Sequence, residues 1–212
     1  MKFHRIRISI RRVLFAALFL IFAHSPAGAA EWALQKQADG IDIYTRPVEG
    51  SDIKEFKAEG MVDIHIDEIV ALLQDSDRFQ EWFPNTSDSR LLKRDGDISY
   101  QYSVMQTPWP ISDRDNIFRS VTTRDTSTGS VHISIEAAPK EIPENNRLHR
   151  VTKATGSWQF TPEGTDKTLV VFVMHLEPGG GLPNWMVNAR IVATPYEALM
   201  NMRKILGVTA SQ

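Results

Sequence analysis

Few residues in this chain are spaced for metal binding or thiol chemistry. The sequence has no cysteine, which excludes disulfides, thiol nucleophiles and cysteine-ligated metals. Two of its six histidines precede residue 30, and the other four do not form the His-Glu-x-x-His spacing of a zinc-binding helix. These four are His65, His132, His149 and His175. We therefore expect no metal, no cofactor and no catalytic residue.

Two other patterns resemble reactive motifs but lack a required part. No Gly-x-Ser-x-Gly elbow is present, so a hydrolase nucleophile is not indicated. The three glycines at 179–181 are not followed by the Lys-Ser/Thr pair of a phosphate-binding loop. We interpret these glycines as a flexible hinge that precedes the last helix.

Asp113 and Asp115 would share one face of a strand, which is the arrangement of an acid pair. Arg114 lies between them in the sequence. Its positive charge would lower the pKa values of both carboxyl groups and so oppose acid catalysis. We therefore interpret the three residues as a charge network, in which Arg114 ties the preceding Pro-Trp-Pro loop to the sheet.

Residues 1–29 have the composition of a secretory signal peptide. Five lysine and arginine residues precede an apolar run at 13–23, and Ala27-Gly28-Ala29 has the small residues of a signal-peptidase site. The run is shorter than the roughly 20 apolar residues that a spanning helix needs. A buried core helix is the alternative, and the clustered arginines argue against it. We predict cleavage after Ala29 or Ala30 and an exported protein, periplasmic or secreted.

Residues 30–212 read as one acidic domain. They carry 19 basic and 26 acidic residues, a net charge of −7, because the first 29 residues hold five basic residues and no acidic one. This balance argues against nucleic acid and against stable docking on an anionic membrane, and leaves transient membrane contact open. No repeat, low-complexity segment or linker divides the domain. We expect a monomer with a single core.

The apolar pattern after residue 40 is that of an antiparallel meander. Alternation with a period of two, separated by short turns, predicts strands at 41–44, 53–62, 89–93, 98–105, 116–124, 130–137, 148–160 and 168–177. Two short helices are predicted at 68–74, capped by Asp67, and at 77–82. A long helix follows from about residue 183 to residue 206, with Pro195 inside it. The sequence therefore predicts an α+β fold, a curved antiparallel sheet with a long C-terminal helix across it.

Two motifs on this framework resemble those of START lipid-transfer domains. The sequence PWPISDRD at 108–115 resembles that family's loop-to-strand motif, and GGLPNWMVN at 180–188 resembles the start of its C-terminal helix. GSW at 156–158 fits the long strand between them. The resemblance covers about residues 32–206 and implies an exported bacterial START protein with the helix-grip fold. Some members have a buried arginine six residues beyond the motif arginine, and that position is Ser120 here, so ligand rules based on it do not transfer.

The resemblance implies a bound lipid and no chemistry. A dry tunnel between sheet and helix, with one or two polar groups for the head, would hold a lipid or another hydrophobic small molecule. Candidate lipid-binding residues are aromatic, methionine and arginine side chains on the predicted strands, the Pro-Trp-Pro loop and the long helix. They are Tyr100, Tyr102, Trp109, Arg114, Phe118, Trp158, Phe172, Met174, Trp185, Met186, Tyr196 and Met200.

Two other functions remain open at this point. The first is an aromatase/cyclase-like enzyme on a hydrophobic substrate, which would need a polar residue such as His132 or His175 pointing into the tunnel. The second is a partner-binding module whose interior is an ordinary core. A cavity of several hundred Å³ would favour lipid binding over the partner-binding module.

Overall fold

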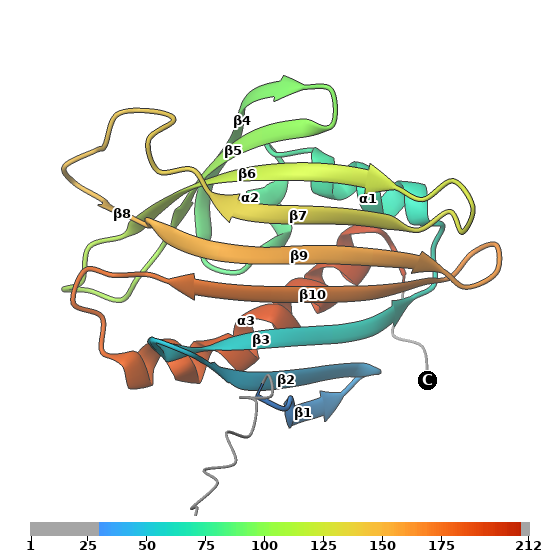
Figure 1. The fold of residues 1–212 in the computed structure, drawn as a ribbon, viewed down its shortest axis with the longest axis horizontal. Helices are drawn as coiled ribbons and strands as arrows, with labels where there is room; N and C mark the ends of the chain where they lie inside the picture. The colour runs from blue at the N-terminus through green and yellow to red at the C-terminus, as the bar shows by residue number, and fades with distance from the viewer. Residues whose placement is uncertain (1–29, 209–212) are drawn as a thin grey trace, which may run out of the picture.

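The computed structural model of the protein describes residues 30–208 (Figure 1). The predicted signal peptide and the Ala29 side of the predicted cleavage site lie outside these residues. Within them, ten strands form one curved sheet whose pairings are antiparallel, except that β8 pairs in parallel with β6. The strands are β1 (Ala33–Ala38), β2 (Ile41–Val48), β3 (Ser51–Val62), β4 (Thr86–Asp95), β5 (Ile98–Met105), β6 (Arg114–Arg124), β7 (Val131–Ala137), β8 (His149–Arg150), β9 (Lys153–Pro162) and β10 (Thr168–Glu177).

The strand order along the sheet is β1-β2-β3-β10-β9-β7-β6-β5-β4. Consecutive strands pair as the meander prediction requires, from β1 to β3, from β4 to β7 and between β9 and β10. The last strand, β10, also pairs with β3, and this pairing joins the N-terminal strands to the rest of the sheet. The chain leaves β3 through two short helices, α1 (Ile66–Gln74) and α2 (Phe79–Trp82), before it returns in β4.

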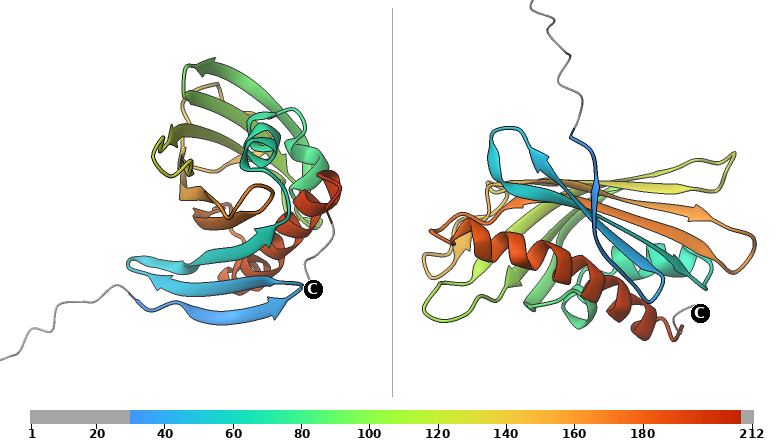
Figure 2. Two further views of the ribbon diagram at one scale, coloured as in Figure 1. Left: turned by 90° about the vertical axis from the view of Figure 1, so that its right-hand side faces the viewer. Right: turned by 90° about the horizontal axis from the view of Figure 1, so that it is seen from below.

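The long C-terminal helix, α3 (Asn184–Ile205), crosses the concave face of the sheet (Figure 2). The helix continues through Pro195, which is buried. The predicted helix-grip architecture is therefore confirmed. None of the helices in residues 30–208 is long and apolar enough to cross a membrane.

Three local features differ from the sequence predictions. β1 was not predicted, because its few apolar residues do not alternate with polar ones and most of its side chains are exposed. The strand expected at 148–160 is divided into β8 and β9, since residues 151 and 152 leave the sheet. α1 is capped by His65 rather than by Asp67, and the Nδ1 atom of His65 accepts a hydrogen bond from the Asp67 backbone N–H at 3.3 Å.

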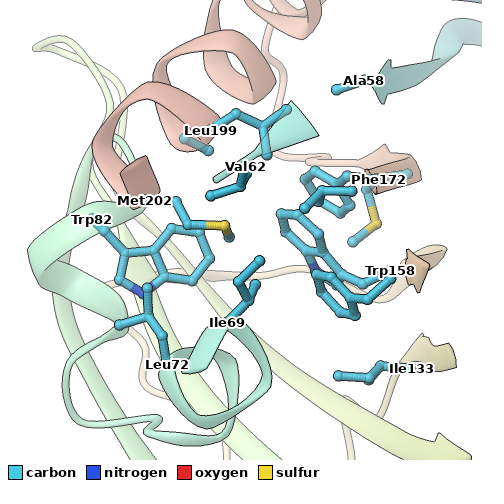
Figure 3. Packing of buried hydrophobic residues seen from close by; sticks show 14 of the residues in the cluster. Ala58, Val62, Ile69, Leu72, Trp82, Ile133, Trp158, Phe172, Leu199 and Met202 are labelled. Carbon is cyan, nitrogen blue, oxygen red and sulfur yellow. The ribbon is translucent and has the colours of Figure 1, made fainter. Parts of the chain in front are cut away.

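The aromatic core lies where β9 and β10 meet the short helices (Figure 3). The rings of Trp158 and Phe172 stack with centroids 3.8 Å apart, and Trp82 meets Trp158 edge-on at 6.1 Å. Gly156 makes room for this packing, because a Cβ there would lie 2.5 Å from the Val173 carbonyl oxygen and 2.9 Å from the sulfur of Met174. The glycine of the GSW motif is thus explained by close approach of the neighbouring strand.

Candidate functional site

Residues of the sheet, of α1 and α2 and of the first half of α3 line a cavity of about 540 Å³. This volume falls within the range of small-molecule sites in proteins, about 300–1,000 Å³. Its apolar walls come from β3, β7, β9 and β10, from the two short helices and from α3. Apolar lining residues include Phe56, Leu73, Phe79, Trp82, Phe83, Ile133, Ile135, Trp158, Phe172, Met174, Leu176, Leu182, Met186, Val187 and Ile191.

Strands β5 and β6 form a different, polar wall. Alternate residues of β5, namely Ser99, Gln101 and Ser103, line the cavity. On β6, Asn116, Ser120 and Thr122 line it together with Phe118. None of the polar residues of this wall was predicted to line the cavity. The alternation along β5 was visible in the sequence, but its tyrosine face was assigned to the interior instead of its serine face.

Five of the twelve predicted lipid-binding residues line the cavity: Phe118, Trp158, Phe172, Met174 and Met186. They come from β6, β9, β10 and α3, so the fold brings together residues that are far apart in the sequence. Whether they touch a lipid stays a prediction. The other seven lie outside the cavity lining.

Tyr100 and Tyr102 face away from the cavity, which corrects their predicted position. Tyr102 is buried in a small second cluster with Val104 and Ile117, beneath a loop that contributes Ile142 and Leu148. Burial raises the pKa of the Tyr102 hydroxyl, and the nearby Asp115 carboxylate adds to this shift. Tyr102 therefore belongs to a small core on the outer side of the sheet, and Tyr100 lies on the same face of β5 and is partly exposed.

Four other predicted residues also lie elsewhere. Trp109 is 92% exposed and Trp185 is 71% exposed, since both side chains point into solvent from segments whose neighbours, Pro108 and Met186, line the cavity. The hydroxyl of Tyr196 donates to Asp39, near the β1–β2 turn. Met200 packs against the main core.

Arg114 is 1% exposed and binds backbone oxygens rather than the cavity or a carboxylate. Its Nη2 donates to the carbonyls of Gly179 at 3.0 Å and Gly180 at 3.3 Å, and its Nη1 donates to Ser112 O and reaches Thr107 Oγ1 at 3.5 Å. Burial lowers the pKa of the guanidinium, and Asp113 opposes this shift. Arg114 thus joins the 107–112 loop to the glycine segment before α3.

The prediction that Asp113 and Asp115 form a charge network with Arg114 is wrong. Asp115 instead forms a buried bidentate pair with Arg150, at 2.9 Å to Nε and 2.8 Å to Nη2. Asp113 accepts from the Thr107 backbone N–H at 2.8 Å. The two carboxylates therefore have different partners and do not form an acid pair. The missed residue, Arg150, lies in the two-residue strand β8, which pairs with the start of β6.

The glycines at 179–181 have a defined conformation. All three have positive φ values, between 60° and 70°, which glycine adopts without steric cost. A Cβ on Gly179 would lie 2.6 Å from the His149 ring, and one on Gly180 would lie 3.0 Å from Nη2 of Arg114. The segment therefore lies directly on His149 and Arg114.

The histidines considered as catalysts do not line the cavity. His132 is exposed on β7, and the ring of His175 lies 3.3 Å from the Ser51 hydroxyl. Of the described residues that line the cavity, Arg190 is the only ionised one, and it is exposed on α3.

The sequence comparisons agree with this geometry. The START domain model matches residues 22–210. An uncharacterized protein of Pseudomonas aeruginosa is 35% identical over 193 residues, which is 90% of this chain and 93% of that protein. The rat phosphatidylcholine transfer protein is 24% identical over 163 residues, 75% of this chain and 76% of its own length.

Solved structures show the same fold. A STAR-related lipid transfer protein fragment from Xanthomonas axonopodis is 34% identical, with a TM-score of 0.78 over 83% of this chain and 98% of that one. Human STARD10 is 20% identical, with a TM-score of 0.71 over 82% of this chain and 71% of that one. The chain belongs to the START domain family.

Proposed function

We propose that this protein binds a lipid or a similar hydrophobic small molecule in the cavity and carries it without chemical change. The observation that supports this most directly is the cavity itself, about 540 Å³ and lined mainly by apolar side chains from every layer of the fold. Each methylene group removed from water contributes about 0.8 kcal/mol, so an acyl chain supplies the binding energy. The similarity to lipid-transfer proteins supports the same function.

Native mass spectrometry of the protein purified from its own host is expected to show a complex with a lipid. The cavity walls would otherwise remain in contact with water, which is unfavourable for so much apolar surface. The added mass should disappear after denaturation and reappear as an extractable hydrophobic compound. A protein that carries no such compound and binds no lipid added afterwards would contradict the proposal.

The same spectrum tests the proposed export. The basic residues, the apolar run and the Ala-Gly-Ala sequence before residue 30 support cleavage there. The polypeptide mass is expected to correspond to a chain that begins at Ala30 or Glu31, in protein recovered from the cell envelope or medium. An intact Met1 terminus in a cytoplasmic fraction would exclude export.

The two exposed tryptophans support a brief contact with a membrane at one end of the cavity. Trp109 and Trp185 are adjacent in sequence to lining residues, and indole rings favour the membrane–water interface. Replacing both with serine is expected to slow lipid transfer between vesicles while leaving the amount of bound lipid unchanged. Unaltered transfer rates would rule out this contact.

An enzymatic role has no specific observation in its favour. The two histidines that such a role would use lie outside the cavity lining, and the acid pair is absent because Asp115 pairs with Arg150. Lipid carriage is therefore the function that this geometry supports best.

A further inference from the structure

The polar wall of the cavity is a regular arrangement of uncharged groups. Ser99 on β5 lies opposite Ser120 on β6, and Ser103 lies opposite Asn116, with Gln101 between them. All five line the cavity. At about 3.4 Å per residue, the row from Ser99 to Ser103 is roughly 14 Å long, so it extends along the cavity rather than marking one point.

Asn116 and Ser103 are the buried polar residues of this wall, and Asn116 has an unpaired side-chain atom. Asn116 is 3% exposed, and its Oδ1 atom has no hydrogen-bond partner among the described residues. A buried polar atom without a partner is unfavourable, and a native protein normally provides one. A ligand that is purely hydrocarbon would leave this wall unpaired, whereas a ligand with hydroxyl groups would pair with it.

The charge of the lining argues against an ionised group inside the cavity. Among the described lining residues only Arg190 has a charged side chain, and it is exposed on α3, whereas Asn116 is buried on β6. Arg114 is buried nearby, but its guanidinium is already bound to backbone oxygens and does not line the cavity. A phosphate or carboxylate beside the serines would therefore lose its hydration without gaining a counter-charge.

Hydroxyl groups fit the wall better than pure hydrocarbon or an ionised head group does. A hydroxyl both donates and accepts, so it can pair with serine hydroxyls and with either end of an asparagine or glutamine amide. The volume also limits the ligand. A volume of about 540 Å³ lies within the range of small-molecule sites, so the cavity suits a lipid-sized molecule rather than a macromolecular partner.

We propose that the ligand is an uncharged lipid whose hydroxyl groups pair with the wall formed by Ser99, Gln101, Ser103, Asn116 and Ser120. Its hydrocarbon part lies against Trp158, Phe172 and α3. This inference rests on the proposed lipid-binding function and adds the chemical class of the ligand.

The test compares three probes that share one acyl chain. The delipidated protein is loaded with Nile red, which is then displaced by 1-monomyristoylglycerol, by the dimethyl ether of that compound, or by myristic acid at pH 8. 1-Monomyristoylglycerol is expected to bind about tenfold more tightly than its dimethyl ether, since the ether cannot donate hydrogen bonds to the wall. It is also expected to bind more tightly than the ionised acid.

Variants of the wall locate the preference. Asn116→Leu is expected to remove most of the difference in affinity between 1-monomyristoylglycerol and its dimethyl ether. Ser103→Ala and Ser120→Ala, which remove one hydroxyl each, should reduce the difference by smaller factors and serve if Asn116→Leu does not fold. Ser134→Ala is the matched control, because Ser134 is exposed on β7 and should have no effect.

The outcomes separate the two proposals. If all three probes displace Nile red equally, or if the wall variants retain the preference, lipid binding stands and the hydroxyl assignment is overturned. Tighter binding of myristic acid that is lost in Arg190→Gln would also overturn it, in favour of an anionic head group at the exposed end. If no probe binds, both the proposed ligand class, an uncharged lipid with hydroxyl groups, and the proposed lipid-binding function are contradicted.

Discussion

Replacing Arg114 with alanine is expected to lower the free energy of unfolding by about 2–4 kcal/mol even without ligand. The guanidinium donates to carbonyl oxygens of the 107–112 loop and of the glycine segment, so its loss removes a charged donor from Ser112, Gly179 and Gly180 and breaks the link between the two segments. Hydrogen bonds to charged groups contribute about 1.5–3 kcal/mol each, and relief of the cost of burying the charge offsets part of the loss. Urea unfolding followed by circular dichroism measures the difference.

Arg119 offers a matched control on the same strand. Its guanidinium pairs with Glu136 at 2.8 Å, and both side chains are partly exposed to solvent. Surface pairs contribute about 0–1 kcal/mol, so Arg119→Ala should change stability little. Equal unfolding midpoints for wild type, Arg114→Ala and Arg119→Ala would mean that the buried bonds of Arg114 contribute nothing to the folded state.

The sequence was sufficient to predict the architecture because long-range order follows from local periodicity. Alternation along β5, β6, β9 and β10 marked the strands, and the spacing of apolar residues after Pro183 marked α3. β1 shows the limit of this approach. Its side chains are mostly exposed, and what holds it is main-chain pairing with β2, which leaves no apolar pattern.

The cavity was harder to predict because periodicity gives two faces without saying which is inside. On β5 the tyrosine face is the more apolar, so it was assigned to the interior. The 138–148 loop covers that face from the outside, and Ile142 and Leu148 pack on Tyr102. The serine face is left to line the cavity. Where a cavity is lined by polar side chains, the more apolar face of a strand can therefore lie on the outside of the sheet.

The first half of α3 was misread for a related reason. Trp185, which was predicted to bind lipid, is exposed, whereas the polar residues Arg190 and Thr194 line the cavity. The fully buried apolar side chains of the helix, such as Ala198, Leu199 and Met202, lie in its second half. A helix that closes a cavity does not need a continuous apolar face along its length, so the spacing rule applied only to its C-terminal part.

Lipid exchange is expected to require separation of the first turns of α3 from the 107–111 loop. Thr107 and Pro108 from the loop and Leu182 and Met186 at the start of the helical segment line the cavity, and Arg114 joins the loop to the glycines just before the helix. Motions that release a ligand involve the less stable segments of a fold, and these two segments form part of the cavity wall. We expect an engineered disulfide between these segments to slow exchange by about tenfold or more, and reduction to restore the rate.

The absence of native cysteine makes this disulfide specific. One cysteine is placed in 107–111 and one in 182–186, as a pair with Cα atoms about 4.4–6.8 Å apart. The control pair replaces Lys153 and Glu177, which are opposite each other on β9 and β10, and its oxidation should leave the exchange rate unchanged. Equal exchange in the oxidised and reduced forms of the first pair would place the opening elsewhere, near α1 and α2.

The opposite change tests the same motion from the other direction. The start of α3 is held to β3 by two asparagines: Asn184 donates to the Asp52 carboxylate at 3.0 Å, and Asn188 bonds to the backbones of Asp52 and Lys54 at 3.1 Å. Opening the helix must break these bonds. Replacing both asparagines with alanine is therefore expected to accelerate exchange severalfold, because three exposed hydrogen bonds are lost. A disulfide could also slow exchange by distorting the cavity, but distortion would not explain faster exchange in the asparagine variant. Slower exchange with the disulfide and faster exchange without the asparagines would therefore identify this helix as the moving part.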